Sequence, residues 1–127
     1  MADSSSWIAV VDDDPAVLKA LSRLLRSRAF RVHTYESGQE LLASFSKGFP
    51  ACLILDLQMP AMSGLELKQR MVRDGLDIPT IMITAHRDPG LDEHEKAGFV
   101  ALLQKPLQDH TLFDAIDKAL GIFRSCG

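Results

Sequence analysis

Ala-Cys-Leu-Ile-Leu-Asp-Leu-Gln-Met-Pro, residues 51–60, is the stretch that decides the fold of this chain. Its apolar part, residues 52–55, is short and unbroken, which is typical of a strand buried on both faces of a parallel sheet. The run ends at one carboxylate, Asp56, and open α/β sheets bind their ligands beyond the carboxyl ends of such strands. Taken alone, the stretch fits an Asp that only caps the following turn equally well.

Apolar runs and helical patterns alternate five times along the 127 residues. Strands are expected at 7–11, 31–35, 52–55, 79–84 and 100–103. Helices are expected to begin after the caps Asp14, Ser37 and Ser63, with a weak polar helix at 90–97 and an amphipathic helix at 109–123. This alternation predicts an α/β fold: a doubly wound, five-stranded parallel sheet with helices on both faces and right-handed crossovers.

The composition excludes several classes of protein. Hydrophobic residues make up 46% and charged residues 24%, which fits one folded domain and not a disordered chain. No apolar run approaches the roughly 20 residues of a membrane span. The net charge of −3 and the lack of a basic stripe argue against direct binding of nucleic acid.

The ends of the chain and its two cysteines complete this outline. Residues 1–6 are expected to form a disordered tail without a signal sequence, 7–123 the domain, and 124–127 a second tail. Cys52 lies in the buried run and Cys126 in the second tail, so a disulfide framework is not expected. A reducing, cytoplasmic setting is the simpler expectation.

Polar residues lie at the carboxyl ends of four of the five expected strands. They are Asp12, Asp13 and Asp14 after the first strand, Asp56 after the third, Thr84 at the end of the fourth and Lys105 shortly after the fifth. The carboxyl ends of parallel strands meet at one edge of the sheet, so we expect these side chains to lie together. The coincidence across four strands favours a ligand site over a simple turn cap at Asp56.

The residue types in this expected cluster point to phosphoryl transfer. Neighbouring carboxylates repel one another unless a cation neutralises them, and oxygen ligands of this kind suit Mg²⁺. Zinc is a poor candidate because His86 is the only His or Cys near these strand ends. Lys105 and the Thr84 hydroxyl would meet charge on a phosphoryl group, with Asp56 as the nucleophile that forms an aspartyl phosphate. The alternative is a purely structural ion-pair cluster around Lys105.

Four motifs in order resemble those of two-component response-regulator receiver domains, most closely receivers of the FixJ type. The motifs are Val10-Val-Asp-Asp-Asp-Pro15, Asp56-Leu-Gln-Met-Pro60 with Ser63-Gly64, Ile83-Thr84-Ala85 and Lys105-Pro106. The resemblance extends over roughly residues 7–123. It implies a flavodoxin-like (CheY-like) sheet with the strand order 2-1-3-4-5.

The resemblance also implies a role for each site residue. Asp56 is the implied phosphoacceptor, with a sensor histidine kinase as donor. Asp13, Asp56 and the Gln58 backbone carbonyl are the implied direct ligands of Mg²⁺, with Asp12 acting largely through water. Lys105, in a cis peptide bond with Pro106, is implied to pair with the phosphoryl group, and Thr84 to turn its hydroxyl toward it. Gln58 and His86 occupy positions that tune the lifetime of the phosphoryl group, although a solvated loop histidine is an equal interpretation of His86.

The resemblance further implies a signalling role in place of classical enzyme activity, although such domains can catalyse their own phosphorylation from small donors and their own dephosphorylation. Output usually passes through the face formed by helix 4, strand 5 and helix 5, often as a homodimer. In FixJ-type proteins it usually reaches a DNA-binding domain, which is absent from this chain.

Two features depart from the family pattern. Leu102 occupies a position that usually holds Tyr or Phe, so the aromatic part of the switch is missing. The segment after Thr84 is about one residue short and poor in apolar anchors, which predicts a short or mobile helix at 90–97.

Three alternatives remain from the residues. A haloacid-dehalogenase-type phosphatase needs a second acid where Gln58 stands, and a flavin phosphate would be repelled by residues 12–14. A phosphate-independent docking domain is opposed by the intact set of acids but supported by Leu102.

Overall fold

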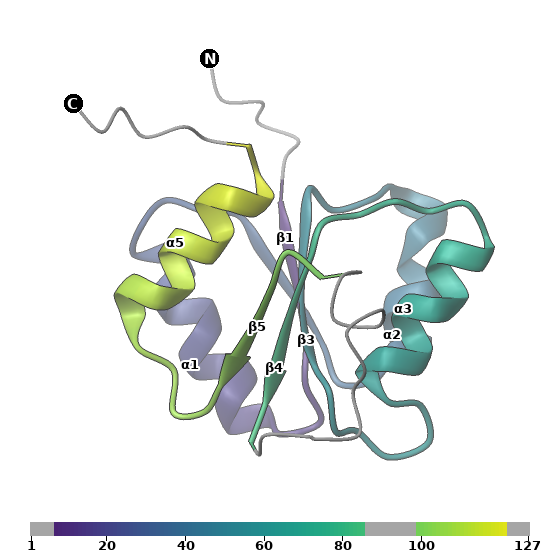
Figure 1. Ribbon diagram of the computed structural model, residues 1–127, viewed down its shortest axis with the longest axis horizontal. Helices are drawn as coiled ribbons and strands as arrows, with labels where there is room; N and C mark the ends of the chain where they lie inside the picture. The colour runs from purple at the N-terminus through teal and green to yellow at the C-terminus, as the bar shows by residue number, and fades with distance from the viewer. Residues whose placement is uncertain (1–6, 86–98, 122–127) are drawn as a thin grey trace.

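The computed structural model describes residues 7–85 and 99–121, which form a five-stranded parallel sheet with helices on both sides (Figure 1). In chain order the elements are β1 (Ile8–Val11), α1 (Pro15–Arg26), β2 (Val32–Tyr35), α2 (Gly38–Ser44), the 3₁₀ turn η1 (Phe45–Lys47), β3 (Cys52–Asp56), α3 (Gly64–Arg73), β4 (Thr80–Thr84), β5 (Ala101–Gln104) and α5 (Asp109–Ala119). The strand order is β2-β1-β3-β4-β5, so the predicted topology is confirmed. The expected tails, the helix at 90–97, His86, Phe123 and Cys126 lie outside the described residues.

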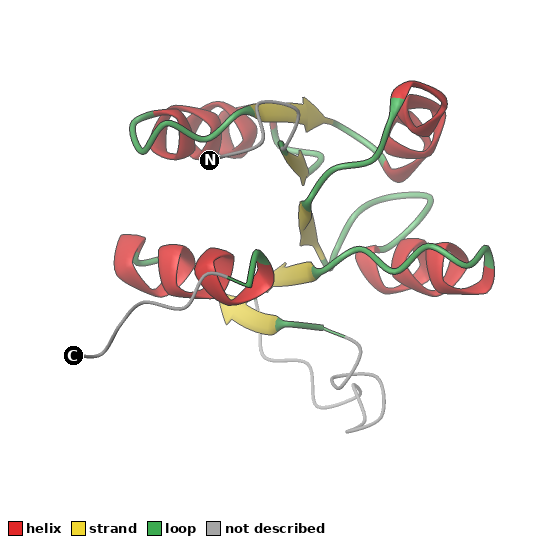
Figure 2. Ribbon diagram, turned by 90° about the horizontal axis from the view of Figure 1, so that it is seen from above, coloured by secondary structure: helices red, strands yellow, loops and turns green. Residues whose placement is uncertain are grey.

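The central strands β1, β3 and β4 are buried at every position, and their side chains are apolar except at Asp56, Thr80 and Thr84. In β1, Ile8 and Val10 pack into the cluster under α1 and α5, whereas Ala9 and Val11 pack into the cluster under α2 and α3. This alternation follows from the two-residue period of a strand. Figure 2 shows the resulting three layers, with the sheet between two pairs of helices.

Side chains cap the first three helices as the sequence predicts. The Asp14 carboxylate accepts a hydrogen bond from the Ala16 N–H at the start of α1, with Pro15 as the first helical residue. Ser63 and Glu66 form a complete capping box at α3. At α2 the box is only half formed: the Ser37 hydroxyl accepts the Glu40 N–H. The Glu40 carboxylate accepts the N–H of Glu36, one residue before the cap. Both helices nevertheless begin where predicted.

The bounds near the C-terminus differ from the prediction. The last helix ends at Ala119, earlier than expected, and Gly121 follows with a φ of 71°, a conformation that an α-helix does not contain. The last strand is Ala101–Gln104, one residue later than expected, so that it ends directly before Lys105. No helix in the described part of the chain has the length and apolar character needed to cross a membrane.

Gly64, the first residue of α3, lies where a side chain has no room. A Cβ atom at this position would lie 2.5 Å from the Asp56 carbonyl oxygen and 2.8 Å from the Met82 sulfur. We expect Gly64→Ala to lower the free energy of unfolding by about 1–3 kcal/mol because backbone must shift to accept the methyl group. Urea denaturation checks this. Gln69→Ala, on the exposed side of the same helix, is the control, and equal stabilities for the two variants would contradict the close approach.

Candidate functional site

Three carboxylates from two neighbouring strands meet at the carboxyl edge of the sheet. Asp56 is the last residue of β3, and Asp12 and Asp13 directly follow β1, its hydrogen-bonded neighbour. One oxygen from each of the three carboxylates lies within 4.8 Å of the others. Asp12 and Asp56 are buried, whereas Asp13 is exposed at the mouth of the site. Among residues 7–85 and 99–121, no other three metal-ligating side chains gather in this way.

Backbone N–H groups hold the two buried carboxylates in place. The Asp14 N–H donates to Asp12 Oδ1 at 2.9 Å, and the Gln58 N–H donates to Asp56 Oδ1 at 3.2 Å. The loop after β3 is itself anchored, since the Leu57 N–H donates to the Ile83 carbonyl at 2.7 Å. The acids are therefore positioned by the loops after the strands and are preorganised for a ligand.

Lys105, which directly follows β5, brings a positive charge to this cluster. Its Nζ lies 3.3 Å from Asp12 Oδ2 and 3.9 Å from Asp56 Oδ2. Its backbone N–H donates to the Thr84 carbonyl at 2.8 Å, which ties it to the end of β4, and its peptide bond to Pro106 is cis, as the resemblance implies. The side chain is partly exposed, so it has freedom to move between the two acids.

The surroundings of Asp56 raise the pKa of its carboxyl group from 3.8 to about 6. Burial is the largest cause, and the negative charges of Asp12 and Asp13 act in the same direction, whereas the Gln58 N–H and Lys105 lower the pKa. Three carboxylates are thus held near a single ammonium group. Hard oxygen donors with this excess of negative charge fit a divalent cation such as Mg²⁺ better than they fit a closed ion-pair cluster.

This raised pKa predicts a dependence of stability on pH in metal-free protein. The folded state holds the Asp56 proton up to about pH 6, whereas the unfolded chain releases it near 3.8. The folded state therefore binds more protons between these values, and its stability falls as the pH rises through them. We expect wild type to lose up to about 3 kcal/mol relative to Asp56→Asn between pH 4 and pH 7.5, measured by urea denaturation in EDTA. If the free energy of unfolding changed with pH in the same way for wild type and Asp56→Asn, the prediction would be wrong.

The structure brings together most of the residues that the sequence singled out. Asp12, Asp13, Asp56 and Lys105 form one cluster. Thr84 is buried at the end of β4, while the Gln58 side chain is exposed beside the cluster. Lys105 lies closer to Asp12 than to Asp56.

Two contributions to the site were missed in the sequence. The Asp14 N–H orients Asp12, and Gly64 lets α3 approach the Asp56 carbonyl. The Ser-Gly pair at 63–64 was the sequence signal that could have predicted the close approach of α3 to Asp56.

Comparison with known proteins agrees with this geometry. The family model described as "Response regulator receiver domain" matches residues 8–117, and the chain belongs to this family. It is 41% identical over 121 residues to the response regulator protein TmoT of Ectopseudomonas mendocina, covering 94% of this chain and 55% of TmoT. The chain thus spans about half the length of the relatives that it matches.

Solved structures give the same result. The crystal structure of FixJ-N superposes with a TM-score of 0.84 at 34% identity, covering 98% of this chain and 99% of that one. The response regulator TrrA of Thermotoga maritima, solved in complex with Mg²⁺-BeF, has a TM-score of 0.81 at 29% identity and covers 91% of this chain and 99% of TrrA. The predicted resemblance to FixJ-type receivers is confirmed.

Proposed function

We propose that Asp56 accepts a phosphoryl group from a sensor histidine kinase and that the modified domain changes conformation to control an output. The observation that carries this proposal is the position of Asp56. Its carboxylate ends the central strand β3, lies with two further acids in one cluster and has the Lys105 ammonium 3.9 Å from Oδ2. A cluster of acids alone would suit a cation. The lysine adds a positive charge that can meet the negative charge on the oxygens of a phosphoryl group.

Asp56, Lys105 and Thr84 have different roles in the proposed transfer. An Asp56 carboxylate oxygen attacks the phosphorus, and the donor group leaves with the bond's electron pair. With its pKa at about 6, the Asp56 carboxyl is ionised and nucleophilic near neutral pH. We propose that Lys105 leaves Asp12 to pair with the new phosphoryl oxygens and that Thr84, at the end of β4, donates its hydroxyl to them. Each contact is stronger in the phosphorylated state, so phosphorylation shifts the population toward it.

We propose Mg²⁺ as the cofactor of this site. The donors that fit it are the carboxylates of Asp12, Asp13 and Asp56 and the backbone carbonyl of Gln58. When bound, the ion would offset the charge of the acids and of the incoming phosphoryl group. The structure of TrrA with Mg²⁺-BeF supports this assignment by analogy.

Intact-mass measurement after incubation with acetyl phosphate tests the chemistry. We expect the mass to rise by one phosphoryl group with Mg²⁺ present, and no adduct in EDTA. Beryllofluoride, which mimics a phosphoryl group, should also alter the protein's spectrum in nuclear magnetic resonance. No adduct together with no response to beryllofluoride would overturn the proposal. It would favour the phosphate-independent docking domain that Leu102 supports.

A groove beside Lys105 supports the proposal of a kinase partner. It lies between α1 and the segment after β5, and its wall is mainly apolar, with Val17, Leu21, Leu24 and Leu107. A protein that delivers a phosphoryl group to Asp56 must dock close to the site, and this groove offers it apolar contact area.

Ala20→Asp tests this docking surface, since Ala20 is an exposed residue of the groove. We expect about tenfold slower transfer from a phosphorylated kinase that labels wild type, because a charge enters an apolar contact. The rate with acetyl phosphate should not change. Ala43→Asp, the same change at an exposed position of α2, is the control. Equal transfer rates for both variants would place the kinase elsewhere.

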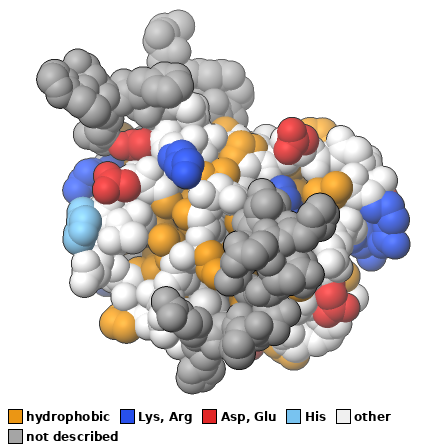
Figure 3. Space-filling view, viewed as in Figure 1, with side chains coloured by type: hydrophobic (Ala, Val, Ile, Leu, Met, Phe, Trp, Pro, Cys, Tyr) orange, Lys and Arg blue, Asp and Glu red, His pale blue; other side chains and the backbone are white. Residues whose placement is uncertain are grey.

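We propose that a second copy docks against the face that contains β5 and α5. Hydrophobic side chains are visible over the middle of this face (Figure 3), and Leu102 is 37% exposed. Because relatives such as TodT are response regulators and others are transcriptional regulators, the output that we propose is control of transcription through a separate DNA-binding domain. Sedimentation of the phosphorylated and unmodified protein would measure the proposed dimerisation.

A further inference from the structure

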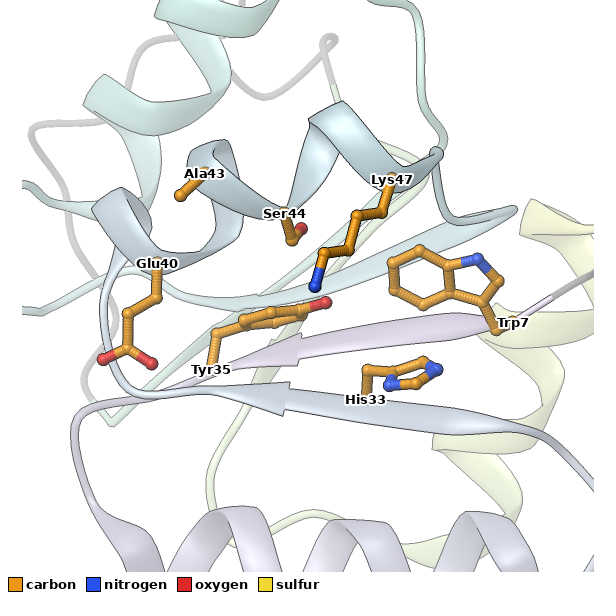
Figure 4. Close-up of a pocket in the computed structure, with 7 residues that line it drawn as sticks. All are labelled: Trp7, His33, Tyr35, Glu40, Ala43, Ser44 and Lys47. Atoms are coloured by element: carbon orange, nitrogen blue, oxygen red, sulfur yellow. The ribbon is translucent and has the colours of Figure 1, made fainter.

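A second cavity of about 690 Å³ lies along the edge strand β2, and no acid of the cluster lines it. It is formed by β2, the start of β1, α2 and η1, as Figure 4 shows. Trp7 and Tyr35 line it, and they are the only tryptophan and the only tyrosine of the chain. Trp7 precedes β1, so its end of the cavity lies at the opposite end of that strand from Asp12. Tyr35 lies nearer the acids, since its backbone carbonyl accepts the Asp12 N–H at 3.1 Å.

The aromatic rings of this cavity are held in place. The Trp7 indole meets the His33 imidazole edge to face, with 4.7 Å between ring centroids and an interplanar angle of 80°. Trp7 and Tyr35 are half-buried and pack against the hydrophobic cluster under α2 and α3. Each therefore has one side fixed by the core while the other lines the cavity, which prepares a surface for a flat apolar group.

The charged groups of the cavity lie on either side of Tyr35. In Figure 4 the Lys47 side chain points toward Tyr35, with its amino group by the hydroxyl end of the ring, and the Glu40 carboxylate lies by the other end of Tyr35. Within the described residues the Lys47 amino group makes no ion pair or hydrogen bond, so its charge is available to an anion. The Glu40 carboxylate accepts the Glu36 N–H at 3.5 Å and remains a negative charge that would repel a second anionic group.

We propose that this cavity binds a planar aromatic monocarboxylate, the chemical class of benzoate. The ring lies against Tyr35 and Trp7, and the carboxylate pairs with Lys47. Glu40 discriminates against dicarboxylates by repulsion. Aliphatic acids lose the ring contact and neutral aromatics lose the ion pair. This proposal stands independently of the phosphoryl chemistry at Asp56.

Tryptophan fluorescence gives a direct test, because Trp7 is the only tryptophan. Benzoate, added to the whole chain, should change the emission in a saturable way. Cyclohexanecarboxylate, benzyl alcohol and terephthalate should each bind about tenfold more weakly, as expected when one main contact is lost or a repulsion is added.

Two lysine variants separate a built site from general attraction of anions. Lys47→Gln should weaken benzoate binding by about tenfold, since it removes the ion pair and keeps Trp7. Lys118→Gln, an exposed change on α5, should leave binding unchanged. The proposal would be overturned if the change in emission never saturated, or if benzoate and cyclohexanecarboxylate bound with equal affinity. It would also be overturned if the Lys47→Gln and Lys118→Gln variants bound benzoate equally well.

Discussion

Asp56→Asn is expected to abolish the phosphoryl adduct formed with acetyl phosphate and Mg²⁺. An amide nitrogen and carbonyl cannot replace the carboxylate as nucleophile, so we expect the rate of modification to fall by about 100-fold or more. The fold should persist, because the amide oxygen can still accept the Gln58 N–H that Asp56 Oδ1 now accepts at 3.2 Å. The measurement is intact mass over a time course, with thermal denaturation to verify folding.

The matched control for this variant is Asp114→Asn on α5. Asp114 is exposed, and the change removes the same charge without touching the cluster. We expect this protein to acquire the adduct at the wild-type rate. If Asp56→Asn were modified as fast as Asp114→Asn, the acceptor would be another residue. The assignment of Asp56 would then fail even though the family membership stands.

The fold was predictable because its main signals are local. Apolar runs such as residues 52–55 need two buried faces, and capping residues such as Asp14 and Ser63 mark the starts of helices. The start of α5 at Asp109 was predicted correctly, but its C-terminal end was harder to predict because it depends on the conformation at Gly121. Where a helix end lacks a capping side chain, periodicity alone places it poorly.

The composition of the candidate site was predictable, but its internal pairing was not. Strand ends place Asp12, Asp56 and Lys105 at one edge of the sheet whatever their rotamers. Which acid the lysine approaches depends on side-chain positions, and here it lies closer to Asp12. The cavity at Trp7 also escaped prediction, since it needs the packing of β2 against α2, which no sequence motif records.

Asp13→Asn is expected to weaken the binding of Mg²⁺ that supports phosphorylation, without removing the acceptor. Asp13 is the exposed member of the three acids, so its carboxylate contributes a ligand at the open side of the site. Replacing it leaves two carboxylates for the cation. We expect the Mg²⁺ concentration at half-maximal rate to rise by about tenfold, the loss typical for one weakened ligand contact. A titration of the acetyl phosphate reaction with Mg²⁺ measures this midpoint.

Asp14→Asn separates a ligand effect from a general loss of negative charge. Asp14 is the next residue, yet its carboxylate caps α1 by accepting the Ala16 N–H at 2.9 Å and is not part of the cluster. Asparagine caps helices as well as aspartate does, so this variant should keep both its stability and the wild-type midpoint. Equal midpoints for Asp13→Asn and Asp14→Asn would mean that Asp13 does not bind the cation. The metal would then be held by Asp12 and Asp56 with backbone and water ligands, as the depth of those two acids in the site allows.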